Sequence, residues 1–287
     1  MKRENGMGFK LFDFQKAAVK KALALYNMLL CVRVGGGKTL ISMVYAKNLL
    51  QKDIVDKVIF ACTVSAAVAV RGEFKEKGNI DIPQFERVPD LLNWIKGKGK
   101  ICVIKHSMFE KLGYDQNVID ELREICEQPN RKLALIIDEA HKIGNDTSIA
   151  NTALKNIKFC FERVLCMTAT PFQSDLSQIY GLLSFLNPTL WKNKREFVRK
   201  YIEEQTIMVN GKVARKEKIA YRNLSDLRAK MEPFTFFYYP KIKLNFFYHN
   251  VTLKDYTEYD NICRGVLTDK ELEKLNEPKK ERKKKNA

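Results

Sequence analysis

A short glycine-rich segment offers the clearest chemistry in the sequence. It reads Gly35, Gly36, Gly37, Lys38 and Thr39. Consecutive glycines let backbone N–H groups turn inward around a phosphate group, and a helix that begins there adds the partial positive charge of its N-terminus. Lys38 would reach the β- and γ-phosphates of ATP, and the Thr39 hydroxyl would bind Mg²⁺. The segment predicts a phosphate-binding loop, although Val32 replaces a further glycine of the full pattern. A glycine-rich turn without a ligand is the alternative.

An acidic pair follows an apolar run further along the chain. Residues 133–137 (LALII) lead directly into Asp138 and Glu139, and Ala140 and His141 come next. At the end of a buried strand, Asp138 would hold Mg²⁺ through water, and Glu139 would orient and deprotonate an attacking water molecule. Adjacent acids can also mark a plain helix N-terminus, where negative charge favours the helix dipole. With the glycine-rich loop upstream, Lys38 and Glu139 are the candidate catalytic residues.

A third segment carries small hydroxyl residues after an apolar run. Residues 164–167 (VLCM) precede Thr168, Ala169, Thr170 and Pro171. At a strand end, the hydroxyl groups of Thr168 and Thr170 can hydrogen-bond the acidic pair and a neighbouring lobe. A strand that ends in a turn before proline explains the same residues equally well. The segment is informative mainly as the third motif in this order.

These motifs need elements that place them together. Five apolar runs of strand length lie at residues 29–34, 58–62, 101–104, 133–137 and 164–167. None alternates with polar residues, which is typical of strands buried on both faces. Amphipathic segments such as 39–51 and 115–127 lie between most of them. The alternation predicts an α/β fold with a parallel sheet flanked by helices, whose ligands bind at the carboxyl ends of the strands.

The pattern changes after Pro171. Residues 175–186, 194–203 and 224–231 have helical patterns, so we interpret 171–240 as a helical elaboration of the sheet domain. Residues 242–252 are predicted to form a strand and 253–275 a helix. We assign 1–260 to one nucleotide-binding lobe and 261–287 to a linker and basic tail, which we expect to be disordered.

Lys and Arg number 51 against 34 Asp and Glu, which gives a net charge of +17. Such an excess is typical of proteins with a polyanionic partner, above all nucleic acid. Part of it lies in the tail, because residues 279–285 (KKERKKK) carry six positive charges and one negative. No apolar run reaches the ~18 residues of a membrane span, and the N-terminus lacks a signal-peptide core. We therefore expect an intracellular protein of the cytoplasm or nucleus, not secreted and without a membrane partner.

The three motifs together resemble those of superfamily-two helicases: GGGKT at 35–39, DEAH at 138–141 and TATP at 168–171. Residues 171–188 (PFQSDLSQIYGLLSFLNP) are similar to the segment that Swi/Snf-type ATPases carry after the same motif. The resemblance covers about residues 9–260. It implies a P-loop NTPase with a RecA-like sheet, the first, ATP-binding lobe of a motor that uses ATP and Mg²⁺.

The resemblance also implies roles for individual residues. Gln15, in residues 10–19 (KLFDFQKAAV), resembles the family's adenine-reading glutamine. The residues implied to contact nucleic acid are Thr63, Lys105, His106 and Ser107. The residues implied to couple nucleotide state to nucleic-acid binding are His141, Thr168 and Thr170. For His106, a polar turn without a ligand is an equal alternative.

The sequence departs from the family in three places. Residues 32–34 (VRV) replace the acidic or small residues usual before the glycines. Tyr238 and Tyr239 stand where the family has a basic pair, and nothing after residue 260 is long enough to form a second RecA-like lobe. In the family that lobe supplies arginines that reach the γ-phosphate. Either the sequence is a fragment, or another chain completes the motor, or the lobe works as a binding module.

Two functional hypotheses follow. The first is a nucleic-acid-dependent ATP hydrolase that translocates on or remodels duplex DNA, with a second lobe supplied in cis or in trans. The second is an ATP- and DNA-binding module with negligible hydrolysis alone. A third, the motor of a restriction or anti-phage system, would show a nuclease or methylase motif, and we find none in the sequence.

Overall fold

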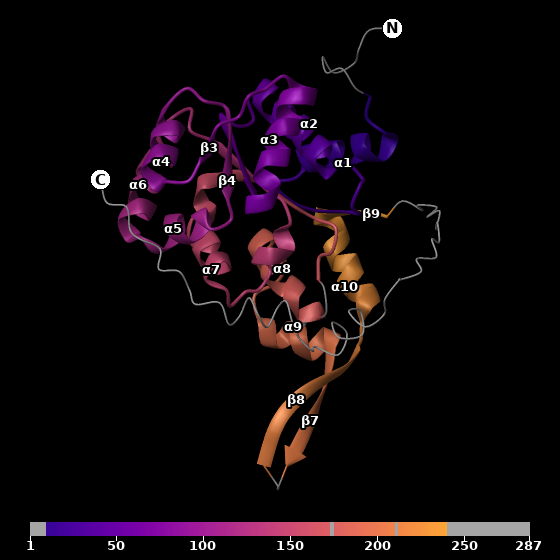
Figure 1. The fold of residues 1–287 in the computed structure, drawn as a ribbon. Helices are drawn as coiled ribbons and strands as arrows, with labels where there is room; N and C mark the ends of the chain where they lie inside the picture. Colours follow the sequence, from indigo (N-terminus) through magenta and orange to yellow (C-terminus); the bar gives the residue numbers. More distant parts are fainter. Residues whose placement is uncertain (1–9, 173–174, 210–211, 240–287) are drawn as a thin grey trace, which may run out of the picture. The chain divides into compact units, whose positions relative to one another are not determined.

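A parallel sheet of seven strands forms the centre of the described part of the chain (Figure 1). The computed structural model describes residues 10–172, 175–209 and 212–239, all within the unit Met1–Pro240. The strands are β1 (Asn27–Val32), β2 (Lys57–Cys62), β3 (Gln84–Phe85), β4 (Ile101–Lys105), β5 (Leu133–Ile137), β6 (Phe161–Thr168) and β9 (Thr235–Tyr238). Their order in the sheet is β3-β4-β2-β5-β6-β1-β9, and all neighbours pair in parallel.

Helices cover both faces of this sheet. One face packs against α1 (Asp13–Ala24), α2 (Lys38–Gln51) and α3 (Val64–Gly78). The other packs against α4 (Val88–Lys96), α5 (Met108–Tyr114), α6 (Gln116–Glu127), α7 (Ile149–Asn156), α8 (Tyr180–Leu186), α9 (Lys194–Tyr201) and α10 (Leu224–Met231). Within the described ranges, no helix is long and apolar enough to cross a membrane.

The unbroken apolar runs of the sequence follow from this two-sided burial. Along β1, Leu29 and Cys31 belong to one core, whereas Leu30 and Val32 belong to the other. Successive side chains of a strand point to opposite faces, so a strand covered on both faces needs an apolar residue at every position. The five runs predicted as strands form β1, β2, β4, β5 and β6, and the predicted parallel sheet is confirmed.

The elaboration after Pro171 is only partly helical. The expected helices appear as α8, which a 3-10 segment at Leu176–Ile179 precedes, and as α9 and α10. However, β7 (Ile202–Val209) and β8 (Lys212–Tyr221) pair as an antiparallel hairpin. Residues 235–238 form β9, which pairs with β1 and so belongs to the main sheet. The expectation of a helical elaboration is therefore corrected for these two segments. Residues 235–238 (TFFY) are all β-branched or aromatic, which favours a strand over a helix. Residues 212–221 (KVARKEKIAY) contain only three such residues, so β8 depends on its pairing with β7.

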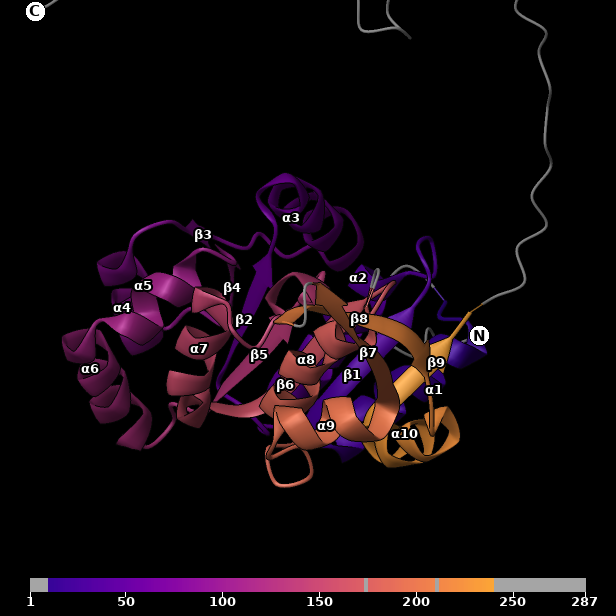
Figure 2. The ribbon, with the colours of Figure 1, turned by 90° about the horizontal axis from the view of Figure 1, so that it is seen from below.

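Contacts at several levels hold the elaboration to the sheet domain. The side-chain amide of Asn27, at the start of β1, donates to the carbonyl of Leu186 at 3.0 Å. Gly181 in α8 lies so close to the carbonyl of Gly144 that a side chain there would overlap it. α9 follows on the outer side of α8, and the hairpin extends beyond α9 (Figures 1 and 2).

The strand predicted at 242–252, the helix predicted at 253–275 and the tail lie outside the described residues. The assignments of 1–260 and 261–287 therefore remain predictions.

Candidate functional site

The three motifs meet at one edge of the sheet because their strands are neighbours. β5, β6 and β1 lie side by side, and their register pairs Ile137 with Cys166 and Cys31 with Thr168. In a parallel sheet these carboxyl ends face the same side, where ligands bind. The loop after β1, the acidic pair after β5 and the hydroxyl segment after β6 therefore share this edge, as the sequence predicts.

The glycine-rich loop has backbone conformations that favour glycine. Gly35 and Gly37 have φ of 80° and 76°, in the left-handed region that side chains disfavour. At Gly36 a Cβ atom would overlap the side chain of Val32. α2 begins at Lys38, whose Nζ lies 3.4 Å from the carbonyl oxygen of Val32. The loop thus presents a helix N-terminus and a lysine ammonium at the sheet edge, the parts of a phosphate cradle.

The side chain of Gln15 is hydrogen-bonded to this loop. Its side chain is buried, its Nε2 donates to the carbonyl oxygen of Gly36 at 3.1 Å, and its Oε1 accepts from the backbone N–H of Phe12 at 3.0 Å. A Cβ atom at Gly37 would lie 2.6 Å from the same Nε2 atom. Gln15 therefore connects the start of α1 to the loop. Its adenine-reading role stays a prediction.

Asp138 carries an unpaired oxygen at the strand ends. Its Oδ1 is buried without a hydrogen-bond partner, and its backbone N–H donates to the carbonyl of Ala61 at 2.8 Å. Burial and the neighbouring Glu139 carboxylate raise the pKa of Asp138, while the Lys38 ammonium opposes that shift. This buried carboxylate oxygen has no partner and lies at the same sheet edge as the loop that leads to Thr39. Such an oxygen fits a hard cation such as Mg²⁺.

Glu139 and His141 are linked to the hydroxyl segment. Glu139 has φ of 47°, which is uncommon for a residue with a side chain. Its Oε2 lies 3.3 Å from Nδ1 of His141, and that nitrogen lies 3.1 Å from the Thr168 hydroxyl. The Thr168 hydroxyl also lies 3.0 Å from the carbonyl oxygen of Thr170 and can donate its hydrogen there; in that arrangement Nδ1 of His141 is the donor in its contact with the hydroxyl. The sequence-predicted coupling residues are thus in direct contact.

A hollow of ≈ 500 Å³ opens over these groups. Its lining comes from four segments: Val34; Thr63, Ser65 and Ala66; Asp138, Glu139, His141 and Lys142; Ala169 and Thr170. Val34, Ser65, Ala66 and Lys142 are not among the site residues that the sequence predicts. Lys142 could have been predicted as a site residue, because it directly follows the acidic motif and its positive charge suits a site that binds phosphate.

The residues implied to contact nucleic acid lie at the neighbouring strand ends. Thr63 occupies the N-cap position of α3 without a side-chain capping hydrogen bond, and its Oγ1 lies 3.2 Å from the Ser65 hydroxyl. Lys105 pairs with Glu86 at 2.6 Å, and this hydrogen bond lowers the pKa of Glu86. Ser107 is exposed. These roles stay predictions, although a Lys105 already paired is less available to a phosphate.

His106 is set inward instead. Burial lowers the pKa of His106 to about 4, despite the opposing carbonyl groups of Asp138 and Ala61. Its ring stacks on Phe109 with centroids 6.2 Å apart, and its Nε2 is buried without a partner. His106 is therefore neutral near pH 7 and supports the peptide that carries Asp138. A direct nucleic-acid contact stays a prediction.

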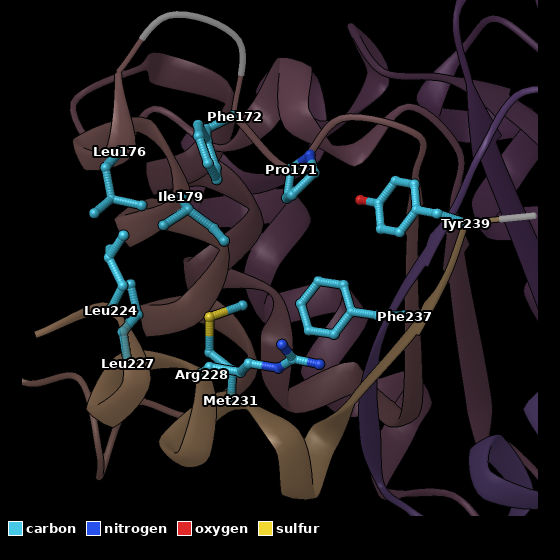
Figure 3. Close-up of a pocket in the computed structure, with 10 residues that line it drawn as sticks. All are labelled: Pro171, Phe172, Leu176, Ile179, Leu224, Leu227, Arg228, Met231, Phe237 and Tyr239. Atoms are coloured by element: carbon cyan, nitrogen blue, oxygen red, sulfur yellow. The ribbon is translucent and has the colours of Figure 1, made fainter. Parts of the chain in front are cut away.

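An apolar pocket of ≈ 340 Å³ adjoins the hydroxyl segment (Figure 3). Its lining joins Pro171, directly after Thr170, to α10 and to the end of β9; Arg228 is the only charged residue among those that line it. Phe237 and Tyr239 are 38% and 53% exposed, so the aromatic segment 236–239 does not pack wholly into the core as its apolar character indicates. Nothing in the sequence pattern reveals this pocket.

The chain is similar in sequence to proteins of one known family. Residues 14–237 match the model of the SNF2-related domain. The chain is 26% identical over 200 residues to the DNA repair and recombination protein RAD54 of Saccharomyces cerevisiae, covering 61% of this chain and 21% of that protein. It is 25% identical over 177 residues to nucleoside triphosphatase I of Amsacta moorei entomopoxvirus, covering 57% and 26%. The chain thus spans about a quarter or less of these relatives.

A solved structure shares the fold. The SWI2/SNF2 ATPase core of Sulfolobus solfataricus, solved in complex with double-stranded DNA, matches with a TM-score of 0.59 and 16% identity. The match covers 81% of this chain and 45% of that one. The sequence resemblance is confirmed, since the family model spans most of the chain from α1 to β9. The chain belongs to the SNF2-related family.

Proposed function

We propose that this chain is the ATP-binding motor lobe of a DNA-dependent ATPase that translocates on or remodels duplex DNA. The observation that carries the proposal is the meeting of the phosphate cradle, the unpaired Asp138 oxygen and the His141–Thr168 contact at one sheet edge. The family supports ATP hydrolysis, since a similar protein is a nucleoside triphosphatase.

Each residue of the edge has a distinct task in this proposal. Loop N–H groups and Lys38 bind the phosphates, and Thr39 and Asp138 hold Mg²⁺. Bound Mg²⁺ neutralises charge that develops on the phosphate oxygens. Glu139 takes a proton from the attacking water. The contact of its carboxylate with His141 Nδ1 at 3.3 Å limits where that carboxylate can point.

The same contacts offer a route from nucleotide to nucleic acid. His141 joins Glu139 to Thr168, and Thr168 is held to Thr170 by hydrogen bonds in both directions, at 3.0 and 3.1 Å. A shift of the Glu139 carboxylate on hydrolysis would therefore reach the segment after β6. This supports the predicted coupling role of the three residues.

Duplex DNA is the proposed polymer. A net charge of +17 supports a polyanion, and the structural neighbour was solved with double-stranded DNA. Work on DNA would place the protein inside the cell. Thr63, Lys105, His106 and Ser107 remain the proposed contacts at the strand ends.

A second RecA-like lobe, in cis or in trans, completes the proposed motor. The structural match covers 45% of the neighbouring ATPase core, which supports a chain that corresponds to part of such a core. The alternative is a module that binds ATP and DNA but has negligible hydrolysis alone. Supplying a second lobe separates the two, because only the motor gains DNA-stimulated turnover.

The decisive binding test is isothermal titration of the chain with Mg·ATP. We expect Lys38→Ala to weaken binding about 10- to 150-fold, the range for loss of a charged hydrogen bond. Its ligand-free stability should barely change, because Nζ makes one long contact with a carbonyl oxygen. Unchanged affinity would remove the phosphate-cradle assignment.

A further inference from the structure

A second charged hollow lies away from the strand ends, between α9 and the base of the β7–β8 hairpin. Its volume is ≈ 720 Å³. Four cationic side chains line it: Lys194, Arg195 and Arg199 from α9, and Arg222 from the residue after β8. Glu204 is the one acidic residue of the lining, and Val198 and Ile202 supply its apolar part. The hollow therefore has an excess of positive charge.

Two of the four cations have structural partners that explain them. Lys194 forms an ion pair with Asp146, in the loop that follows His141. Arg222 donates from Nη2 to the carbonyl oxygen of Arg199 at 2.6 Å. This carbonyl lies in the last turn of α9, where a cation satisfies free backbone oxygens and favours the helix dipole. Lys194 and Arg222 thus also hold α9 in place.

Arg195 and Arg199 have no such explanation. Both are exposed, and neither guanidinium has a carboxylate partner among the residues that the structure describes. They stand four residues apart on one side of α9, with Val198 between them in the lining. Like charges at this spacing destabilise a helix, and Arg222 adds a third guanidinium beside them. Electrostatic repulsion between these guanidinium groups destabilises the chain alone, and a bound anion would offset this repulsion.

We propose that this hollow binds backbone phosphates of duplex DNA. It would be a second contact, apart from the sheet edge at the carboxyl ends of β1, β5 and β6, which we call the strand-end edge. Guanidinium groups match phosphate oxygens with paired hydrogen bonds, and cations that neutralise phosphates release counterions. The proposal rests on the proposed function, which supplies DNA as the partner. The ion pair between Lys194 and Asp146 connects the hollow to the loop that begins at the acidic motif.

The test is duplex DNA binding by the whole chain, measured by fluorescence anisotropy across a range of salt concentrations. We expect Arg195→Ala/Arg199→Ala to lower affinity by about tenfold or more and to reduce the slope of log K against log salt by about 2, because each phosphate contact contributes about 0.9. Arg195→Lys/Arg199→Lys keeps both charges and should recover most of the slope.

The matched control is Lys20→Ala/Lys52→Ala, which removes two exposed cations elsewhere and the same total charge. Equal losses in the control and the arginine variant would overturn the inference, since net charge would then explain both. Thermal unfolding establishes that each variant is folded. If the alanine pair unfolds, the lysine pair and Arg195→Gln alone carry the test, with a smaller change in slope expected for one charge.

Failure of this inference is distinct from failure of the proposed function. If the parent chain binds duplex DNA and the arginine variant binds it equally well, the hollow is not a DNA contact, while the function stands. If the parent chain does not bind duplex DNA at all, both are wrong. Competition by polyglutamate that depends on Arg195 and Arg199, with DNA affinity unaffected, would identify an acidic protein segment as the occupant and overturn the assignment.

Discussion

The strand-end edge and the α9–hairpin region hold their charged groups in opposite ways. Asp138 directly follows β5 and Thr168 ends the adjacent strand β6, whose register with β5 is fixed. The Asp138 Oδ1 atom is buried, and the Thr168 hydroxyl lies 3.1 Å from His141 Nδ1. In the α9–hairpin region, Arg195 and Arg199 lie on a short helix, are exposed to solvent and have no carboxylate partner among the described residues. The first arrangement suits chemistry, which needs groups fixed in position. The second suits contact with a long, repeating polyanion, where position matters less than charge.

Glu139→Gln tests the chemical side of this comparison and has the largest expected effect. The amide keeps the shape of the side chain but cannot accept the proton, so hydrolysis by the complete assembly should fall by about 10²- to 10⁴-fold. Mg·ATP affinity should remain close to that of the parent chain. Glu110→Gln, an exposed change of the same type, is the control. Loss of ATP binding would show that Glu139 has a structural or metal-binding role instead.

A substitution of His106 tests whether a neutral histidine stabilises the strand-end edge. The pKa of His106 falls from an ordinary 6.5 to about 4 in the folded chain. A lowered pKa gives stability that is present above about pH 6.5 and is lost as pH falls toward 4, amounting to about 3 kcal/mol. We expect His106→Asn to show a weaker decline in unfolding free energy over this range, measured by urea titration. The same decline in parent and variant would contradict the buried, neutral histidine.

Gly181→Ala tests the join between the two regions. The added methyl group would overlap the carbonyl of Gly144, in the loop that follows His141. Such overpacking costs about 1–3 kcal/mol or more, read as a lower unfolding midpoint. The control is Gly72→Ala in α3, where a Cβ atom meets nothing within 4 Å, and alanine should be neutral or stabilising. Equal effects at the two glycines would mean that α8 does not press on this loop.

The smallest expected effect concerns the base of the hairpin. Lys218 in β8 pairs with Asp175, ahead of α8. Both side chains are partly exposed, so Lys218→Ala should cost only about 0.2–1 kcal/mol of stability. ATP affinity should not change, and thermal unfolding and titration measure the two quantities. A clear loss of ATP affinity would show that the hairpin acts on the strand-end edge after all.

The sequence predicts the sheet and the motifs well because each depends on local patterns. Strands buried on both faces are apolar throughout, and the loop before α2 needs glycine at positions 35 and 37, where φ is positive. Neighbouring strands then bring Lys38, Asp138 and Thr168 to one edge without further information. For the hairpin, the sequence offers only the Asn-Gly pair at 210–211, a common pair between two strands, because the five charged residues of 212–221 (KVARKEKIAY) do not indicate a strand.

Other features depend on contacts between distant segments, which no local pattern contains. β9 was unexpected because a four-residue strand depends on its pairing with β1. The hydrogen bond from Gln15 to the carbonyl of Gly36 joins α1 to the loop. The hollow at α9 likewise depends on Arg222, which is hydrogen-bonded to Arg199 from 23 residues further along the chain. The environment of His106 also combines a near neighbour in sequence, Phe109, with the distant backbone groups of Ala61 and Asp138.

Steady-state phosphate release with saturating duplex DNA tests the central claim most directly. In the proposed function the strand-end edge supplies Lys38, the proposed Mg²⁺ ligands Thr39 and Asp138, and the proposed base Glu139, whereas the arginine that stabilises the γ-phosphoryl charge comes from a second lobe. Such an arginine is worth about 10³- to 10⁵-fold in rate. We predict that the 287-residue chain turns over poorly by itself and that a second RecA-like lobe, fused or added, restores DNA-stimulated release that Glu139→Gln abolishes. Turnover of several per second by the unaided chain would contradict this account, because the site would then be complete without a second lobe.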